Sequence, residues 1–591
     1  MALLDLNRNN LDHSNSQYLL DHAENPIWWQ QWGKEIIGEA KRLKKPLFVS
    51  VGYSSCHWCH VMSNEAFSDK NTADYLNKNF ICIKVDREER PDIDSYLMKF
   101  ITAQTGSGGW PLNVFMSYDL KPFYALTYAP CEPVSYIDSF KNIAEKAYGY
   151  YIENKENIGE FKIYKDDISF DMLDVIGKLL SISDIDNGGF TGRNKFPPHT
   201  TILFLLYYLC SFKNENALKF VKKTLNMMQL RGLNDHLAGG IFRYCVDNAW
   251  TIPHFEKMLY DQVMALWCYS LAYKVTGITN YKDMAKRILN CMEGSFFEDG
   301  LYVTSFDADT DHIEGGTYIW DKDELKNILT DKEFQKLSDV YQIENKGNFK
   351  GKIHLIRKNN KSLDSIEKKL LKNRKKRVQP KRDNKFICGL NALAVISLIQ
   401  TSRNLDEPDQ EFKASVLMEK IIDVFWKDNL LYHSLFDSRL QKKAFLFDAG
   451  CVLTALTMLY ETDKKWESLM DRIYDYIQTF KKDGIYYESY GDDFHKVPAD
   501  DLDHPIPSSV SITEMGILRY RILKDEKRDA MTYKSAYHSD FHNISVLIDQ
   551  GLFHLRKTMM NYSWKDIFPN SVMIEDSSET DCYMGSCRKI K

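Results

Sequence analysis

The sequence predicts an α/β domain, followed by a longer all-α domain and a short mixed C-terminal segment. At 591 residues, the chain is too long for one hydrophobic core, because single cores stop growing near ~250–300 residues. Short apolar runs alternate with helical patterns in the first quarter of the chain, and helical patterns dominate after about residue 165. We therefore expect domains at residues 1–160, 161–525 and 526–591.

The α/β prediction depends on three short apolar runs. Residues 46–52 form a continuous apolar run that ends at Gly52, as in a buried parallel strand. Helical patterns over 32–45 and 61–79 flank this run, and further strands are expected at 80–86 and 112–116. Helices that alternate with buried strands predict a sheet with right-handed crossovers.

The second domain is predicted from paired helices. Helical hairpins over about 350 residues cannot each bury an apolar face alone, so they must stack into a solenoid or close into a toroid. Residues 388–403 are apolar nearly all round, which favours the inner layer of a double-layered toroid. In the tail, 544–548 and 571–574 are expected as strands that flank a helical stretch. Helices are expected at 200–212, 215–231, 254–276, 281–297, 388–403, 411–427, 447–462, 464–481 and 508–523.

Composition excludes some partners. A formal net charge of −5 gives no field that would attract nucleic acid or an anionic membrane. The basic run at 365–382 is interpreted as a solvated helix and loop. No stretch reaches the ~20 apolar residues of a membrane span, and charged residues interrupt the first 30 positions. We expect a cytoplasmic protein with mostly free thiols, without a cofactor and without nucleic-acid or membrane partners.

The first candidate site is Cys56-His57-Trp58-Cys59, placed directly after a predicted strand and at the start of a helix. Unsatisfied N–H groups at a helix N-terminus stabilise a thiolate, which makes Cys56 the expected nucleophile and Cys59 the resolving thiol. Pro111 precedes another strand, where thioredoxin folds place a cis-proline facing the disulfide. We therefore expect a thioredoxin-like redox site with a cis Trp110–Pro111 bond. His57, Trp58 and Trp110 are candidate substrate contacts.

Three other interpretations fit this motif. Cys56 to His60 matches the C-x-x-C-H pattern of haem attachment, but a strand precedes it and no export signal is seen. A metal site is open to Cys56, Cys59, His57 or His60, but no second ligand pair stands at finger-like spacing, and no metal is expected. Inert core cysteines are disfavoured because this turn should be exposed at a helix start.

The second candidate site lies within residues 235–261. A helix beginning near Pro253 would place His254, Lys257 and Asp261 on one face, and carboxylates beside histidine suit proton abstraction or glycosidic cleavage. A network that only locks the loops between helices fits the same residues. The expected catalytic residues are His254, Glu256, Asp261, Asp307 and Asp309, and the expected substrate-binding residues are Asp235, His236, Arg243, Asp247, Trp250, Lys257 and Tyr260.

Several long motifs carry a resemblance to a known family. They include Tyr18-Leu-Leu-Asp-His22, Cys56-His-Trp-Cys-His-Val-Met62, Lys84-Val-Asp-Arg-Glu-Glu-Arg-Pro-Asp-Ile93 and Pro253-His-Phe-Glu-Lys-Met-Leu-Tyr-Asp261. In these stretches, and over nearly its whole length, the chain resembles the spermatogenesis-associated (YyaL-type) thioredoxin-domain family. The resemblance implies a thioredoxin-like domain followed by an (α/α)6 toroid similar to those of N-acylglucosamine 2-epimerases and six-hairpin glycosidases. Cys582 and Cys587 fit the family's ending and are a possible second redox pair.

Two functions follow from these sites. The first is thiol–disulfide exchange at Cys56 and Cys59, with the toroid binding a protein thiol or disulfide partner and Cys582 and Cys587 relaying electrons if the tail folds back. The alternative is carbohydrate epimerisation, isomerisation or hydrolysis in the toroid, with the thiols regulatory or metal-binding. A non-catalytic binding protein is a third hypothesis. The second half departs from the family's motifs, for example at Leu390-Asn-Ala-Leu393 and Pro507-Ser-Ser-Val-Ser511.

Overall fold

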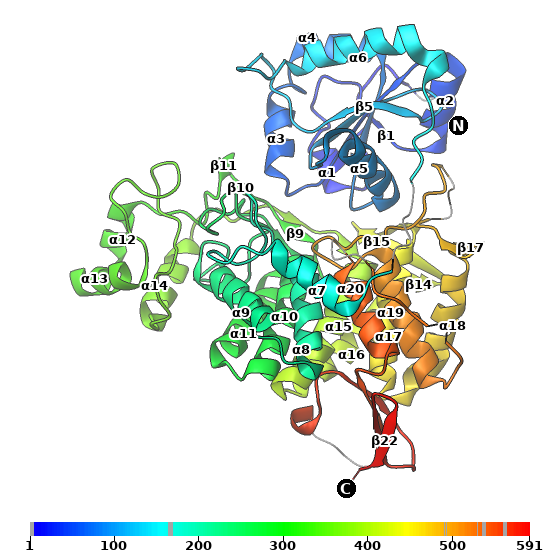
Figure 1. The fold of residues 1–591 in the computed structure, drawn as a ribbon. Helices are drawn as coiled ribbons and strands as arrows, with labels where there is room; N and C mark the ends of the chain where they lie inside the picture. Colours follow the sequence, from blue (N-terminus) through cyan, green and yellow to red (C-terminus); the bar gives the residue numbers. More distant parts are fainter. Residues whose placement is uncertain are drawn as a thin grey trace.

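The computed structural model describes residues 5–163, 169–489, 491, 493–528, 530–534, 539–559 and 564–590. An N-terminal α/β unit sits over one end of a ring of helices, and the C-terminal strands lie at the opposite end (Figure 1). Within the described ranges, no helix is both long and apolar enough to span a membrane.

The N-terminal unit is built on a five-stranded sheet of order β1-β3-β2-β4-β5. Strands β1 to β3 are parallel, β4 runs antiparallel to β2, and β5 runs antiparallel to β4. Strands β2, β3 and β4 are buried throughout, as expected of continuous apolar runs covered on both faces. The strands predicted at 46–52, 80–86 and 112–116 are confirmed. The bounds are β1 Gln30–Gln31, β2 Leu47–Gly52, β3 Ile81–Asp86, β4 Leu112–Met116 and β5 Pro122–Leu126.

Six helices accompany this sheet. The helical pattern expected over 61–79 forms two helices, because α3 ends at Asn64 and α4 begins only after Asp69. The Asp69 carboxylate accepts the backbone N–H of Thr72 at 2.7 Å and so caps the new helix. The helices are α1 Gln17–Leu20, α2 Lys34–Leu43, α3 His57–Asn64, α4 Lys70–Asn79, α5 Pro91–Thr105 and α6 Phe140–Asn154.

The second unit is a closed ring of six inner helices. Each inner helix packs on the next one along the chain, and the last returns to the first, which excludes an open solenoid. Every residue of α15 is buried, which explains why its sequence is apolar nearly all round. The inner helices are α8 His199–Ser211, α10 Leu259–Thr276, α15 Cys388–Leu405, α17 Leu446–Tyr460, α19 Ser509–Leu523 and α20 Asp540–Asp549. The outer helices are α7 Met172–Ser181, α9 Glu215–Leu230, α11 Thr279–Cys291, α16 Asp409–Phe425 and α18 Glu467–Gln478.

Short strands and three further helices are inserted between the ring helices, and the three helices project to one side of the ring (Figure 1). One small sheet has the order β12-β9-β6, a second joins β13, β15, β14 and β16, and β10 pairs with β11. Their bounds are β6 Lys257–Met258, β9 Ser305–Phe306, β10 Asp309–Thr310, β11 Ile313–Glu314, β12 Arg382–Asp383, β13 Phe386–Ile387, β14 Trp426–Lys427, β15 Leu430–Phe436 and β16 Arg439–Lys443. The helices are α12 Lys322–Ile328, α13 Asp331–Val340 and α14 Asp364–Arg374. Two more strand pairs are β7 Phe297–Glu298 with β8 Leu301–Tyr302, and β17 Lys481–Lys482 with β18 Ile485–Tyr486.

Two predicted elements are wrong. The strand expected at 544–548 lies inside helix α20, which completes the ring, and a fully buried helix segment shows no periodicity to distinguish it from a strand. The helix expected from Pro253 begins only at Leu259, because 253–258 is irregular or extended chain. The strand expected at 571–574 is confirmed as β20 Ser571–Ile574, in a sheet of order β20-β19-β21-β22 with β19 His554–Lys557, β21 Thr580–Tyr583 and β22 Ser586–Lys589.

The basic run at 365–382 is also less solvated than expected. Arg374 is only 6% exposed, and its two terminal nitrogens each donate to the Asp235 carboxylate at 2.8 Å. One terminal nitrogen of Arg377 donates to both carboxylate oxygens of Glu324 on α12. Arg374 therefore holds α14 to Asp235 of the ring, and Arg377 holds the loop after α14 to α12.

Buried charges join the two units. Lys385 of the ring lies 2.7 Å from Asp86 and 3.2 Å from Glu88 of the N-terminal unit. Arg90 pairs with Asp493 at 2.8 Å across the same junction. Because such groups are costly to separate from their partners, these contacts fix the sheet over the mouth of the ring.

Candidate functional site

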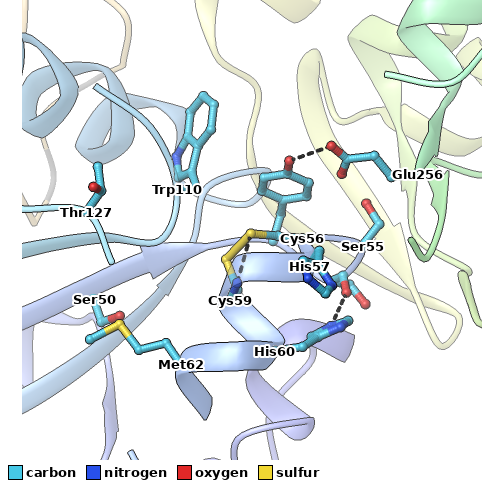
Figure 2. The surroundings of a disulfide bond; sticks show 12 residues. Ser50, Ser55, Cys56, His57, Cys59, His60, Met62, Trp110, Thr127 and Glu256 are labelled. Carbon is cyan, nitrogen blue, oxygen red and sulfur yellow. Dashed lines mark hydrogen bonds between the residues drawn. A yellow bond between two sulfur atoms is a disulfide. The ribbon is translucent and has the colours of Figure 1, made fainter. Parts of the chain in front are cut away.

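The first predicted site is a disulfide at the start of a helix. Strand β2 ends at Gly52, and Cys56 is the N-cap residue of α3. Cys56 and Cys59 are bonded, and the backbone N–H of Cys59 donates to Cys56 Sγ at 3.2 Å. The Trp110–Pro111 peptide bond is cis, as predicted. Figure 2 shows the disulfide with Trp110 on one side and His57, His60 and Glu256 on the other.

The disulfide is not exposed, contrary to the expectation for this turn. Cys56 is 4% exposed and Cys59 is 1% exposed. Residues of the ring cover the turn: Tyr53 donates to Glu256 Oε1 at 3.2 Å, and the N–H of Ala308 reaches the carbonyl of Ser55 at 3.4 Å. The argument against buried cysteines was therefore wrong, because it considered the N-terminal unit without its neighbour.

A histidine–carboxylate group lies beside the disulfide. His57 Nδ1 is 2.8 Å from Asp309 Oδ1, and His60 Nδ1 is 3.4 Å from Asp309 Oδ2 and 3.5 Å from Asp307 Oδ1. Burial opposes charge on His60, but Asp309 and Asp307 raise the pKa of His60 to about 9. Burial raises the pKa of Asp307 to about 6, against the effect of His60. The two histidines outweigh burial at Asp309 and lower its pKa.

Glu256 forms a second part of the same site. Burial raises the pKa of Glu256 to about 8, against the opposing effects of Arg243 and the Tyr53 hydrogen bond. Its Oε2 atom has no hydrogen-bond partner among the described residues. Arg243 lies 3.4 Å from Asp261 and over the ring of Tyr260 at 4.9 Å. A buried carboxyl that holds its proton near neutral pH can donate or accept a proton here.

The two predicted sites are thus one site at the junction of the units. His254 completes it on the ring side, with Nδ1 3.0 Å from Glu314 Oε1 and its ring 5.5 Å from that of His57. The predicted residues that lie in or beside this junction are Cys56, His57, Cys59, Trp110, Pro111, Arg243, His254, Glu256, Tyr260, Asp261, Asp307 and Asp309. Trp58 stands at its edge and is 41% exposed.

Asp235, His236 and Lys257 belong to a different network. Asp235 binds Lys257 Nζ at 2.7 Å and also Arg374. Burial opposes ionisation of Asp235, but these two cations hold its pKa well below the ordinary value. His236 Nε2 lies 3.0 Å from the Arg231 carbonyl. The cavity beside Asp235 and His236 has about 10 Å³, enough for one water molecule and too small for a sugar ring.

Two more predicted residues organise a loop. The Asp247 carboxylate accepts backbone N–H groups of Ala249, Thr251 and Ile252 at 2.8–3.1 Å. Trp250 is fully buried and donates from Nε1 to the Asn187 carbonyl at 3.0 Å. These contacts match the loop-locking alternative.

The prediction that His254, Lys257 and Asp261 share one helix face is wrong. His254 and Lys257 precede α10, on non-helical chain, and only Asp261 lies on the helix. Consequently, His254 contacts Glu314, Lys257 contacts Asp235, and Asp261 contacts Arg243. A helical wheel cannot represent residues that lie outside the helix.

Sequence reasoning missed several residues of the junction, among them Tyr18, Tyr53, Arg87 and Glu314. The Arg87 guanidinium lies over the rings of Tyr53 and Trp110, at 5.5 and 3.9 Å. The Tyr18 hydroxyl and Cys59 Sγ lie on the same side of Gly52: a Cβ added there would meet the hydroxyl and stand 2.8 Å from the sulfur. That hydroxyl has no hydrogen-bond partner among the described residues. Tyr18 and Arg87 could have been found from the sequence, because both lie in motifs that carry the family resemblance.

The second cysteine pair is far from the first. Cys582 and Cys587 form a disulfide across the β21–β22 hairpin, with Cα atoms 4.0 Å apart. This hairpin lies at the end of the ring opposite the N-terminal unit (Figure 1). The tail does not fold back onto Cys56, so the predicted electron relay is wrong for this arrangement.

Comparison with known proteins identifies relatives over most of the chain. Residues 8–165 match the Thioredox_DsbH family model, described as "Protein of unknown function, DUF255". The Caenorhabditis elegans "Uncharacterized protein B0495.5" is 31% identical over 88% of this chain and 81% of its own length. Spermatogenesis-associated protein 20 of Mus musculus is 35% identical over 54% of this chain and 44% of its own length.

Solved structures resemble the chain more distantly. The structure of cellobiose 2-epimerase from Spirochaeta thermophila covers 64% of this chain and 94% of its own, with 11% identity and a TM-score of 0.41. A sugar epimerase from a ruminal bacterium covers 64% of this chain and 96% of its own, with 15% identity and a TM-score of 0.31. We draw no functional argument from likenesses at this level.

Proposed function

The chain belongs to the family of spermatogenesis-associated protein 20 and the Caenorhabditis elegans protein B0495.5, and we propose that it is a thiol–disulfide oxidoreductase with a thioredoxin-like first unit. One observation carries the proposal: the Cys56–Cys59 pair begins α3, and Cys56 Sγ accepts the Cys59 N–H. A helix N-terminus stabilises negative charge on sulfur, which is what a nucleophilic thiolate requires.

The reaction is a two-step exchange. In the reduced protein, the Cys56 thiolate attacks one sulfur of a substrate disulfide, forms a mixed disulfide and releases the other sulfur as a thiolate. Cys59 loses its proton and attacks Cys56, which re-forms the Cys56–Cys59 bond and releases the second substrate thiolate. The substrate gains two electrons and two protons, and an external thiol reductant restores the dithiol.

The hydroxyl of Tyr18 supports the second step. Cys59 is almost fully buried, so the thiolate that attacks Cys56 needs a hydrogen-bond donor from the protein. The unpartnered Tyr18 hydroxyl lies beside Cys59 Sγ, where it can donate a hydrogen bond to that thiolate. Tyr18 is thereby a positioning residue for the resolving cysteine.

The ring acts as a cover in this proposal. Tyr53, Ser55 and Cys56 lie against ring residues, so a substrate reaches the disulfide only when the ring rim moves away from α3. Trp58 is exposed at the edge of the covered region and packs on Tyr128 at 5.0 Å, which offers an aromatic contact to an incoming partner.

Exchange with a small disulfide tests the function. Full-length protein is reduced, and the loss of a chromogenic aromatic disulfide is followed in wild type, Cys56→Ser and Cys131→Ser. Cys131 is a free, half-exposed thiol outside the site and serves as the matched control. We expect Cys56→Ser to abolish catalytic turnover in the presence of an external thiol, and Cys131→Ser to retain it. Equal turnover in wild type and Cys56→Ser contradicts the proposal.

Glu256 favours a second candidate function, acid–base chemistry on a carbohydrate at the ring mouth. It is a buried carboxyl with a pKa of about 8 beside Arg243, and such a group serves as a general acid at neutral pH. A panel of reducing sugars and glycosides, incubated with wild type and Glu256→Gln and read by chromatography, tests it. Product that forms in wild type and disappears in Glu256→Gln supports this function; an unchanged panel removes it.

A further inference from the structure

We propose that His60, Asp307 and Asp309 form a binding site for one divalent transition-metal ion, such as Zn²⁺, at the junction of the two units. His60 lies on α3 of the N-terminal unit, and the two aspartates lie where β9 leads into β10 of the ring. One ligand atom from each residue lies within 4.8 Å of the others. The site therefore draws ligands from segments almost 250 positions apart in sequence.

The distances suit a shared ion. His60 Nδ1 is 3.5 Å from Asp307 Oδ1 and 3.4 Å from Asp309 Oδ2. A charge-assisted N–H···O contact is shorter, at about 2.8 Å. Two ligands that each bind zinc at about 2.0–2.1 Å in tetrahedral geometry stand roughly 3.3 Å apart. The observed separations match two edges of such a coordination shell.

The hydrogen bonds around the group orient the ligand atoms. His60 Nε2 lies 2.8 Å from the carbonyl of Ser54, which only accepts, so Nε2 carries a hydrogen. When a metal ion replaces the Nδ1 proton, the lone pair of Nδ1 faces both carboxylates. A histidine that binds metal through one nitrogen usually donates from the other to a carbonyl or carboxylate in this way. His57 holds Asp309 from the opposite side at 2.8 Å.

The ligand set selects the class of metal. Ca²⁺ and Mg²⁺ prefer shells made of oxygen alone, whereas an imidazole nitrogen beside carboxylates suits zinc and its first-row neighbours. Three protein ligands leave a fourth position for water or another small ligand. Cys56 is in a disulfide, so its sulfur is not needed as a ligand. The proposal therefore applies to the oxidised protein and does not depend on the thiol activity proposed above.

Metal titration of the oxidised, full-length protein tests the site. The protein is freed of metal with a chelator and titrated with Zn²⁺ by calorimetry and with Co²⁺ by visible absorption. We expect one ion per chain and the d–d bands of tetrahedral Co²⁺, without a thiolate-to-metal charge-transfer band. Because even residues that only support a ligand change metal affinity by about 10–100-fold, we expect at least about 100-fold weaker binding in Asp307→Asn/Asp309→Asn.

The same loop provides a matched control. Asp311 is exposed and is not a member of the group, so Asp311→Asn should bind metal like the wild type. Thermal melts of the metal-free variants separate loss of ligands from loss of fold. The Co²⁺ spectrum of the wild type tests the site without any variant. The proposal is overturned if the wild type binds neither ion, if Asp307→Asn/Asp309→Asn binds as tightly as the wild type, or if the Co²⁺ spectrum shows thiolate ligation.

Discussion

Lys385 is the residue whose removal should open the junction over the disulfide. It is fully buried, and its Nζ atom lies 2.7 Å from Asp86 and 3.2 Å from Glu88 of the N-terminal unit and 3.5 Å from Asp383 of the ring. We propose the substitution Lys385→Met, which keeps the aliphatic volume and removes the charge. The carboxylates then remain buried without their cation for as long as the two units stay together.

The size of the effect follows from this arrangement. Removal of one partner from a buried ion pair costs about 3–5 kcal/mol. Burial already raises the pKa of Glu88 to about 7, against the effect of Lys385, so the freed carboxyl takes up a proton and relieves part of the cost. A remaining cost near 3 kcal/mol raises the population of the open arrangement roughly 100-fold, since 1.4 kcal/mol is tenfold. Loss of Lys385 removes the cation that lowers the pKa of Glu88, so this carboxyl is already protonated in the variant at neutral pH.

The assay is the rate at which a thiol reductant opens each disulfide. Samples are quenched by alkylation, and the two cysteine pairs are read separately by mass spectrometry. Cys582–Cys587 is the internal control, because Cys587 is exposed at the far end of the ring. In Lys385→Met we expect Cys56–Cys59 to be reduced roughly 100-fold faster at pH 7.5, with the Cys582–Cys587 rate unchanged. Adding Asp86→Asn to Lys385→Met should restore much of the slow rate, because Asp86 is the carboxylate 2.7 Å from the removed cation.

Equal Cys56–Cys59 rates in wild type and Lys385→Met would refute the reasoning, because access would then not depend on the junction. A thermal melt shows whether the variant has unfolded altogether, and restoration by Asp86→Asn separates a charge effect from a general loss of packing.

Three further predictions concern single positions. Glu256→Gln should raise the melting temperature above that of the wild type at pH 9 and change it little at pH 4. The pKa of Glu256 is raised in the folded protein, so its contribution to stability is fully present below the unfolded pKa and is lost as pH rises through about 8. Equal melting curves at pH 9 would contradict this prediction. Gly52→Ala should lower the melting temperature, because the new Cβ would stand 2.8 Å from Cys59 Sγ. Gly38 lies in open space within α2, so Gly38→Ala should instead stabilise the protein by about 0.5–1 kcal/mol. Urea denaturation of both variants gives the comparison. Tyr18→Phe should leave stability within about 0.5 kcal/mol, since its hydroxyl has no partner among the described residues, but slow re-formation of the disulfide in a stopped-flow oxidation assay; an unchanged rate removes its role.

Local patterns predicted much of the fold. The strand that ends at Gly52, the helix that Cys56 begins and the cis bond before Pro111 are all confirmed, because each depends on residues adjacent in sequence. Five inner helices, α8, α10, α15, α17 and α19, were likewise predicted as helices, and residues 388–403 as apolar nearly all round. The α20 segment was mistaken for a strand because complete burial removes the periodicity that separates the two.

The composite site could not be predicted in the same way. Cys56 and Glu256 were each identified, but their proximity depends on how the N-terminal unit docks on the ring, through contacts such as Tyr53 with Glu256. His60 was named as a possible metal ligand beside the two cysteines, but its partners Asp307 and Asp309 are about 250 positions away and could not be assigned to it. Spacing along one chain does not report contacts between units.

The pH dependence of Cys56 alkylation tests the central claim most directly. Fully reduced wild type and Lys385→Met are treated with iodoacetamide over a range of pH, and the modified peptides are quantified by mass spectrometry. The difference between the two proteins reports the burial of Cys56, and the pH profile in Lys385→Met reports its intrinsic reactivity. The account predicts that Cys56 reacts faster than Cys59 and reaches half-maximal rate well below pH ~8.5, the value of an ordinary thiol. A Cys56 thiol in Lys385→Met that reacts no faster than Cys59, with the profile of an ordinary thiol, would contradict the account.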